Sequence, residues 1–95
     1  MTDVREGEGK MDKKVDSIKE VDLNEYEMTT IVVYDHHGDY PESYSARVFE
    51  NGEPTEIVIV KDDVDEIQQD IRENTDKIFF PRGVADKPYI VGVWM

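Results

Sequence analysis

The chain has 95 residues and contains no cysteine. This absence excludes disulfide bonds, thiolate zinc sites and cysteine nucleophiles. Small secreted domains often depend on disulfides, so the absence favours a reducing compartment. No apolar run approaches the roughly 18 residues that a membrane-spanning helix needs, and the opening stretch MTDVREGEGK lacks the apolar core of a signal peptide. We therefore expect a cytoplasmic protein without a membrane partner.

Basic residues are also scarce, because 11 Lys and Arg stand against 23 Asp and Glu, a net charge of −12. Such a surface disfavours direct binding to nucleic acid or anionic membranes and favours basic proteins as partners. Apolar residues make up 38% of the chain, below the roughly 45–50% of ordinary globular proteins. One small domain is expected, with a core that does not use every residue. A simpler explanation of the charge is that it keeps a small protein soluble.

Residues 1–27 have no continuous apolar pattern. Val15 and Ile18 have helical spacing, whereas Val21 and Leu23 alternate with polar residues as they would in a strand. We predict a flexible or weakly structured acidic arm over residues 1–27. The pattern leaves open whether this arm packs on the domain or on a second copy of the chain.

The remaining residues, 28–95, predict a single α+β domain. Runs of β-branched and aromatic residues indicate strands, and Asn51-Gly52 is typical of a tight turn between two of them. The predicted strands are residues 29–34, 43–50, 55–60, 77–80 and 89–95. A helix is predicted over residues 62–74, where apolar residues have the spacing of one stripe. The order β-β-β-α-β-β predicts one helix packed on a small, mostly antiparallel sheet.

Two adjacent histidines, His36 and His37, lie between two aspartates after the first strand. Such side chains bind zinc or manganese, and the stretch VVYDHHGD resembles the Asp-His-His signature of the DHH phosphoesterases, which implies a manganese-dependent hydrolase. That family has a longer chain with several further aspartate motifs in a parallel βαβ framework, and neither is present here. Adjacent side chains on an extended backbone also point in opposite directions. We favour a solvent-exposed turn at Gly38 and Asp39, and predict no metal site, no cofactor and no enzymatic activity.

Acidic residues are concentrated between Glu50 and Asp76. This stretch of 27 residues holds ten acids and two bases, which leaves a net charge of −8. The ten acids that we predict to bind a partner are Glu50, Glu53, Glu56, Asp62, Asp63, Asp65, Glu66, Asp70, Glu73 and Asp76. Four of them would form one exposed row on the predicted helix, namely Asp62, Glu66, Asp70 and Glu73.

Such a row places a carboxylate roughly every 4.5–6 Å, comparable with the ~3.4 Å advance per phosphate of one DNA strand. Like charges at this spacing destabilise a helix, which favours a binding role for them. A short acidic chain with aligned carboxylates resembles the DNA-mimic proteins that bacteriophages make against their hosts. The resemblance implies an inhibitor that occupies the DNA-binding surface of a basic host protein, such as a histone-like nucleoid protein, in the host cytoplasm. It also implies a homodimer, because many members of that class are dimers.

Two alternatives remain open. One is a small adaptor or scaffold module that binds protein through its sheet face or an edge strand. If Trp94 and the pair Phe79-Phe80 lie on the face opposite the helix, they form an apolar patch for a partner. The other alternative, which we favour less, is the metal-dependent hydrolase.

Overall fold

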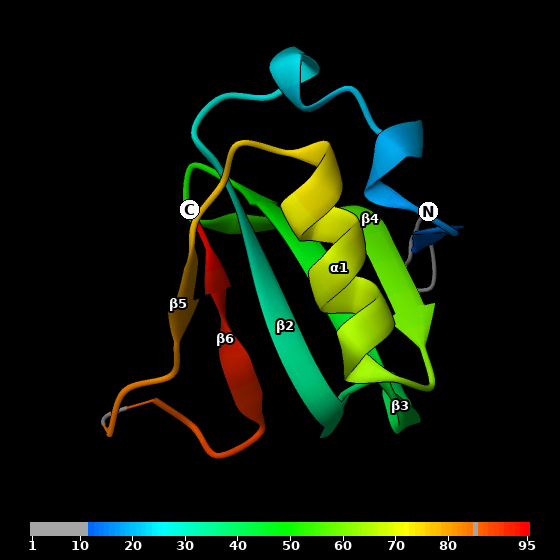
Figure 1. The fold of residues 1–95 in the computed structure, drawn as a ribbon, viewed down its shortest axis with the longest axis vertical. Coiled ribbons are helices and arrows are strands. Elements are labelled where there is room, and N and C mark those ends of the chain that lie inside the picture. The colour runs from blue at the N-terminus through cyan, green and yellow to red at the C-terminus, as the bar shows by residue number, and fades with distance from the viewer. Residues whose placement is uncertain (1–11, 85) are drawn as a thin grey trace, which may run out of the picture.

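The computed structural model describes residues 12–84 and 86–95. The elements in chain order are β1 (Lys13–Val15), the 3₁₀ helices η2 (Ile18–Glu20) and η3 (Leu23–Glu25), β2 (Thr29–His37), β3 (Tyr40–Glu50), β4 (Glu53–Lys61), α1 (Val64–Asn74), β5 (Phe79–Pro81) and β6 (Ile90–Trp94). The strands form one six-stranded sheet in the order β1-β4-β3-β2-β6-β5, and α1 packs on one side of it (Figure 1). Every neighbouring pair is antiparallel except β1 and β4. The predicted α+β class is confirmed.

Strands β2, β3 and β4 form a meander whose turns are as short as the backbone permits. Asn51 and Gly52 both have positive φ, 53° and 84°, as expected of a tight hairpin turn. Gly38 has φ 69° in the turn before it, where His37 pairs with Tyr40. Because only Gly38 and Asp39 separate the strands, β2 and β3 reach further toward this turn than the sequence pattern predicts.

Helix α1 begins at Val64, later than the predicted start at residue 62. Asp63 has an extended backbone, with φ −121° and ψ 122°, and its side chain accepts a hydrogen bond from the Asp65 backbone nitrogen at 2.9 Å. It is therefore the N-cap. The predicted apolar stripe is confirmed, because Ile67 and Ile71 are both fully buried.

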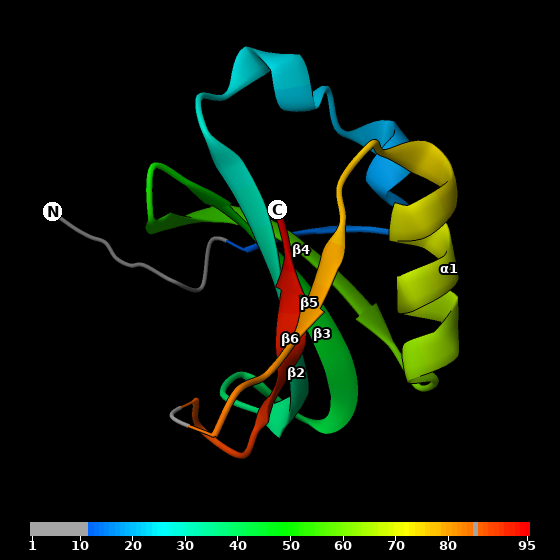
Figure 2. The ribbon, with the colours of Figure 1, turned by 60° about the vertical axis from the view of Figure 1, so that its left-hand side comes forward.

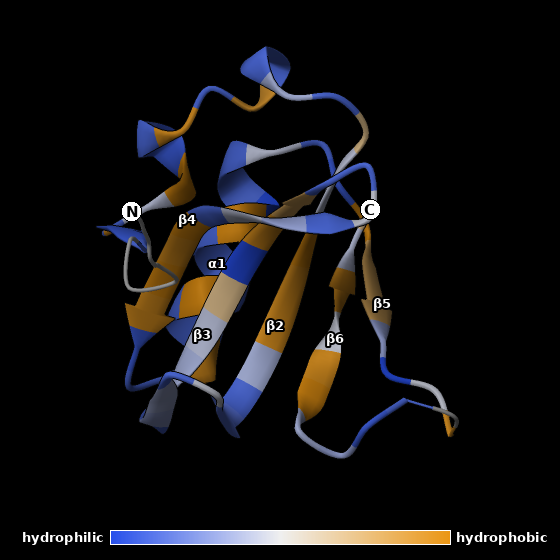
Figure 3. Ribbon diagram, turned by 180° about the vertical axis from the view of Figure 1, so that it is seen from behind, coloured by the Kyte–Doolittle hydropathy of each residue, from blue (hydrophilic) through white to orange (hydrophobic). Residues whose placement is uncertain are grey.

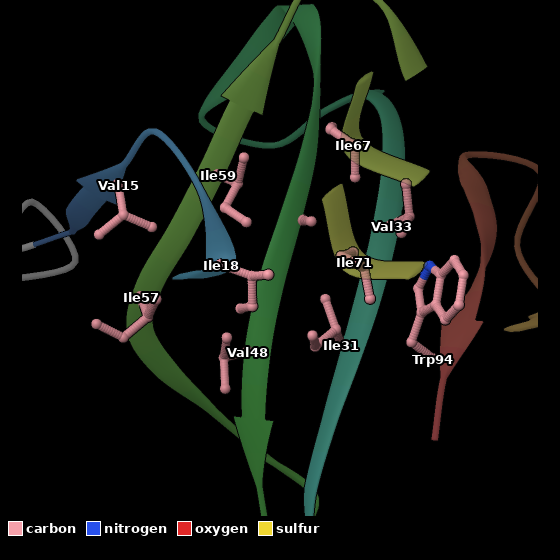
Figure 4. Packing of buried hydrophobic residues seen from close by; sticks show 11 residues of the cluster. Val15, Ile18, Ile31, Val33, Val48, Ile57, Ile59, Ile67, Ile71 and Trp94 are labelled. Atoms are coloured by element: carbon pink, nitrogen blue, oxygen red, sulfur yellow. The ribbon is translucent and has the colours of Figure 1, made fainter. Parts of the chain in front are cut away.

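The core lies between α1 and the sheet and is built mainly from branched aliphatic side chains (Figure 4). Trp94 is 2% exposed, and its indole nitrogen donates a 2.9 Å hydrogen bond to the Gln68 side chain. The Phe79 ring lies 5.2 Å from the Trp94 ring, centroid to centroid, over Gly92, where a Cβ atom would lie 2.4 Å from the Phe79 ring. Trp94 and Phe79 therefore belong to the face under the helix, so they do not form the apolar patch that was considered for the opposite face. Only Phe80 points away from the core, and it is 49% exposed.

Residues 12–27 are part of the domain rather than a weakly structured arm. Strand β1 pairs in parallel with β4 at the edge of the sheet, and Ile18 in η2 is 2% exposed within the core (Figure 4). The sequence pattern misses this because β1 and η2 are too short for a periodicity to be visible. Residues 1–11 of the predicted arm lie outside the described residues.

The two faces of the sheet differ in what covers them. Helix α1 and η2 lie on one face, and among the described residues no helix lies on the other, which we call the open face (Figure 3). Alternation along the strands decides which side chains point there. On β3, Ala46 and Val48 point into the core, whereas Ser45, Arg47 and Phe49 point to the open face.

Candidate functional site

Three of the predicted acids come together on the exposed side of α1. Glu66, Asp70 and Glu73 line a shallow depression of about 290 Å³, together with Asp16 from the segment between β1 and η2. We call these four residues the helix acidic face. Asp16 was missed from the sequence, since only the packing of residues 12–27 on the helix brings it there. Lys61 also borders this depression.

Asp70 has a structural role that the sequence does not predict. Its carboxylate accepts hydrogen bonds from the Ser17 hydroxyl at 2.6 Å and from the Ile18 backbone nitrogen at 2.7 Å. A third bond comes from the side-chain amide of Asn74 at 3.1 Å. The Asp70 carboxylate therefore holds η2 against α1, and most of its acceptor capacity is used within the domain.

The first two acids of the predicted helix do not belong to the helical row. Asp62 lies in a bend before the N-cap, and Asp63 is the N-cap itself. The row of four carboxylates is therefore shortened to the three that lie on α1. Asp65, in the first turn, is exposed and lies near the positive end of the helix dipole.

The hairpin acids lie apart from the helix acidic face. Glu50 and Glu53 pair across the β3–β4 turn, and Glu56 lies with them around one shallow hollow. Strand β4 runs from Glu53 to Lys61, and at ~3.3 Å per residue its two ends are separated by roughly 26 Å. Figure 2 shows this turn extending on the side of the sheet away from α1. The ten acids therefore form no single track, and Asp76 follows the far end of the helix.

Few of these carboxylates are neutralised within the domain. Over residues 12–84 and 86–95, none of the ten predicted acids forms an ion pair with a lysine or arginine. Glu66 is exposed and has no side-chain hydrogen bond in this part of the chain, whereas Glu73 accepts one from Gln69 at 2.9 Å. Uncompensated carboxylates on one face give a negative potential there, which attracts cationic groups.

The two histidines point to different neighbours. His36 contacts the Asp35 carboxylate and meets the Tyr44 ring edge-on at 5.0 Å, whereas His37 stacks on Tyr89 with ring centroids 3.5 Å apart. Over the described residues, no group of three or more His, Asp or Glu side chains is arranged to hold a metal ion. The turn at Gly38, predicted as the alternative to a metal site, is the conformation observed.

A pocket of about 350 Å³ lies on the open face beside this turn. Its lining comes from the neighbouring strands β4, β3, β2 and β6, from the β2–β3 turn and from Tyr89 just before β6. Aromatic side chains dominate its lining, which includes Tyr34, His37, Tyr40, Phe49 and Tyr89. The sequence pattern does not predict that these aromatic residues line a pocket.

Arg47 lies in this pocket and is neutralised by Asp12. Its guanidinium donates two 2.9 Å hydrogen bonds to the two Asp12 carboxylate oxygens, and Tyr40 donates a third to the same carboxylate at 2.9 Å. The hydrogen bonds to Asp12 are the main reason that the pKa of Arg47 is raised. Burial, followed by the bond to Asp12, raises the pKa of Tyr40 to about 12. The group fastens the start of the described chain to the open face.

Comparison with known proteins finds no matching protein family, no matching curated protein and no matching solved structure. The described part of the chain contains no helix with the length and apolar character needed to cross a membrane.

Proposed function

We propose that the chain is an acidic DNA mimic that occupies the DNA-binding surface of a basic host protein, with a histone-like nucleoid protein as the expected type of target. The observation that carries this proposal is the helix acidic face, where exposed carboxylates of Glu66 and Glu73 lie beside Asp16 without an ion pair among the described residues. On this proposal the protein acts in the cytoplasm of a bacterial host.

The proposal differs from the sequence-based hypothesis in where the partner binds. Asp70 is engaged by η2, and the hairpin acids lie on another side of the molecule. The contact to a basic groove is therefore assigned to Glu66, Glu73 and Asp16. Exposed carboxylates attract a basic groove through the solvent, and this attraction weakens as salt rises.

A matched pair of double variants tests the proposal. Glu66→Gln with Glu73→Gln removes two charges from the helix acidic face, and Glu53→Gln with Glu56→Gln removes two exposed charges from the hairpin. The measurement is displacement of a short fluorescent DNA duplex from a purified histone-like nucleoid protein. We expect the helix double variant to be about tenfold weaker, because each exposed pair contributes up to ~1 kcal/mol, and the hairpin double variant to remain close to the parent.

Three results would contradict the proposal. One is the absence of displacement by the parent chain at low salt. Another is equal weakening by both double variants, which would indicate that only net charge matters. The third is binding that does not weaken between low and high salt, since charge-led binding must be screened.

One observation favours the adaptor alternative. At the β5 edge, the exposed side chains of Ile78, Phe80 and Met95 are 65%, 49% and 56% accessible, and Ile78 and Met95 exchange two backbone hydrogen bonds. Apolar contact through this edge would bind a partner or a second copy with little salt dependence. Sedimentation of the parent and of Phe80→Ser in low and high salt separates this candidate, and also tests the predicted homodimer.

A further inference from the structure

The pocket on the open face contains a stacked set of aromatic rings that are not part of the hydrophobic core. Tyr34, His37 and Tyr89 have ring planes within 27° of one another. The closest pair, His37 and Tyr89, has centroids 3.5 Å apart and planes 8° apart. Because the His37 and Tyr89 rings lie face to face, each covers one face of the other. Only an outer face of this pair can therefore stack on a planar ligand, as aromatic faces do.

Ser45 supplies a polar group beneath these rings. It is 4% exposed and lines the pocket, and it is the buried polar residue of the described chain. The Ser45 hydroxyl has no hydrogen-bond partner among residues 12–84 and 86–95. A buried hydroxyl without a partner is destabilising, so this one indicates a group that is supplied from outside the chain.

The size and position of the pocket favour a small molecule over a peptide strand. Its volume of about 350 Å³ lies at the lower end of the ~300–1,000 Å³ range of ligand sites. The pocket lies over β2 and β3, each of which already has a neighbour on both sides. Pairing with an added strand needs a free edge, so a bound peptide has no backbone partner here.

The charges at the pocket favour a neutral ligand. Arg47 is paired with Asp12, and the Lys14 ammonium lies over the Tyr40 ring, 5.5 Å from its centroid. Lys14 thus covers the Tyr40 ring, and Arg47 places a second positive charge at the pocket, so that both disfavour a cationic ligand. An anionic ligand is repelled by a chain with a net charge of −12.

We propose that the open-face pocket binds a neutral, planar aromatic small molecule that stacks on an outer face of the His37–Tyr89 pair and hydrogen-bonds to the Ser45 hydroxyl. Tyr34 also lines the pocket. This inference is independent of the helix acidic face, and removal of the Glu66 and Glu73 charges should leave it unchanged.

The first experiment uses the full chain and small probes of matched size, followed by amide chemical shifts in NMR. Indole is the neutral aromatic probe, tryptamine its cationic and indole-3-acetate its anionic counterpart, and cyclohexanol is a neutral ring without aromatic character. We expect saturable shifts with indole, concentrated around Tyr34, His37, Ser45 and Tyr89, and much weaker shifts with the other three. No saturation with indole, or equal or tighter binding of cyclohexanol or a charged probe, would overturn the proposal.

The second experiment uses the adjacent histidines as a matched pair. His37 lines the pocket, whereas His36 contacts Asp35 and Tyr44 outside it. Asparagine is chosen as the replacement at both positions, because His36 has φ 48° and asparagine tolerates a positive φ. We expect His37→Asn to weaken indole binding about three- to tenfold and His36→Asn to leave it unchanged. Equal effects of the two variants would overturn the proposal.

Ser45→Ala provides a further readout. Loss of one hydrogen bond should weaken indole binding about two- to tenfold, and should leave the position of the shifted amides unchanged. Unaltered affinity in a folded Ser45→Ala variant would overturn the role of the hydroxyl. If that variant does not fold, the His37 and His36 comparison still decides the aromatic part of the proposal.

Discussion

The Ser17 hydroxyl donates a 2.6 Å hydrogen bond to the Asp70 carboxylate, although 53 positions separate the two residues in the chain. The backbone nitrogen of Ile18 donates to the other oxygen of the same carboxylate at 2.7 Å. One helix acid therefore fixes the segment before β2, and positions Asp16 beside Glu66 and Glu73. One acidic residue therefore stabilises the fold, whereas others are proposed to bind the partner.

Asp70→Asn is expected to lower the free energy of unfolding by about 1.5–3 kcal/mol, because an amide presents one acceptor and one donor group where two donors now converge. The matched control is Glu66→Gln on the same helix. Its side chain is exposed and unbonded over the described residues, so the change should stay within about 0.5 kcal/mol. Denaturant unfolding measures both, and equal values would contradict the assignment of Asp70 to the scaffold.

Ile18→Ala tests whether residues 12–27 belong to the domain. Ile18 is 2% exposed and Ile78 is 65% exposed, so the same substitution at the two positions compares a buried with an exposed isoleucine. We expect Ile18→Ala to cost about 2–5 kcal/mol through the lost burial and the cavity, and Ile78→Ala to cost less than about 0.5 kcal/mol. A small effect at Ile18 in thermal and denaturant unfolding would show that this segment contributes little to the core.

Ser45→Ala should leave the stability of the domain unchanged or raise it by up to about 1 kcal/mol, because it removes a buried hydroxyl without a partner among the described residues. Thr55→Val is the contrasting variant. The Thr55 hydroxyl donates to the Val48 carbonyl at 2.7 Å and accepts from the Ile57 nitrogen at 3.2 Å, so its loss should cost about 1 kcal/mol or more. Calorimetry distinguishes them, and a clear loss of stability in Ser45→Ala would show that its hydroxyl is satisfied in the free protein.

Tyr40 is expected to ionise at a higher pH than an ordinary tyrosine. Its pKa is raised from the ordinary tyrosine value of 10.0 to about 12, first by burial and then by its bond to Asp12. Because the folded-state pKa lies above the unfolded value, Tyr40 contributes stability below pH 10 that is lost as the pH rises toward about 12. Tyrosinate absorbance should show this late step in the parent and lack it in Tyr40→Phe. Loss of an early step instead would contradict the assignment.

The main secondary-structure elements could be predicted from the sequence because each has a strong local pattern of residues. β-branched runs predict β2 and β4, the Asn51-Gly52 pair predicts the hairpin, and the spacing of Ile67 and Ile71 predicts α1 and its buried face. These signals act over a few residues and depend on backbone preference and on the separation of apolar from polar side chains. They are therefore independent of how the chain packs.

The candidate sites were only partly predictable. Glu66 and Glu73 follow from helical spacing, but the joining of Asp16 to them and the structural use of Asp70 depend on contacts across more than 50 positions. In the same way, the ring stack of His37 and Tyr89 joins the end of β2 to the start of β6. No local pattern records such a contact, because neither partner changes the preference of the other until the sheet has formed.

The sequence by itself determined the charge of the protein, the type and order of its main elements and the side chains that each element buries, since these follow from composition and periodicity. Only the tertiary structure decided which carboxylates share a surface, which one is taken up by the scaffold, and that the open face holds an aromatic pocket. Those outcomes depend on strand order and on the path of residues 12–27, which are set by the packing of the whole chain.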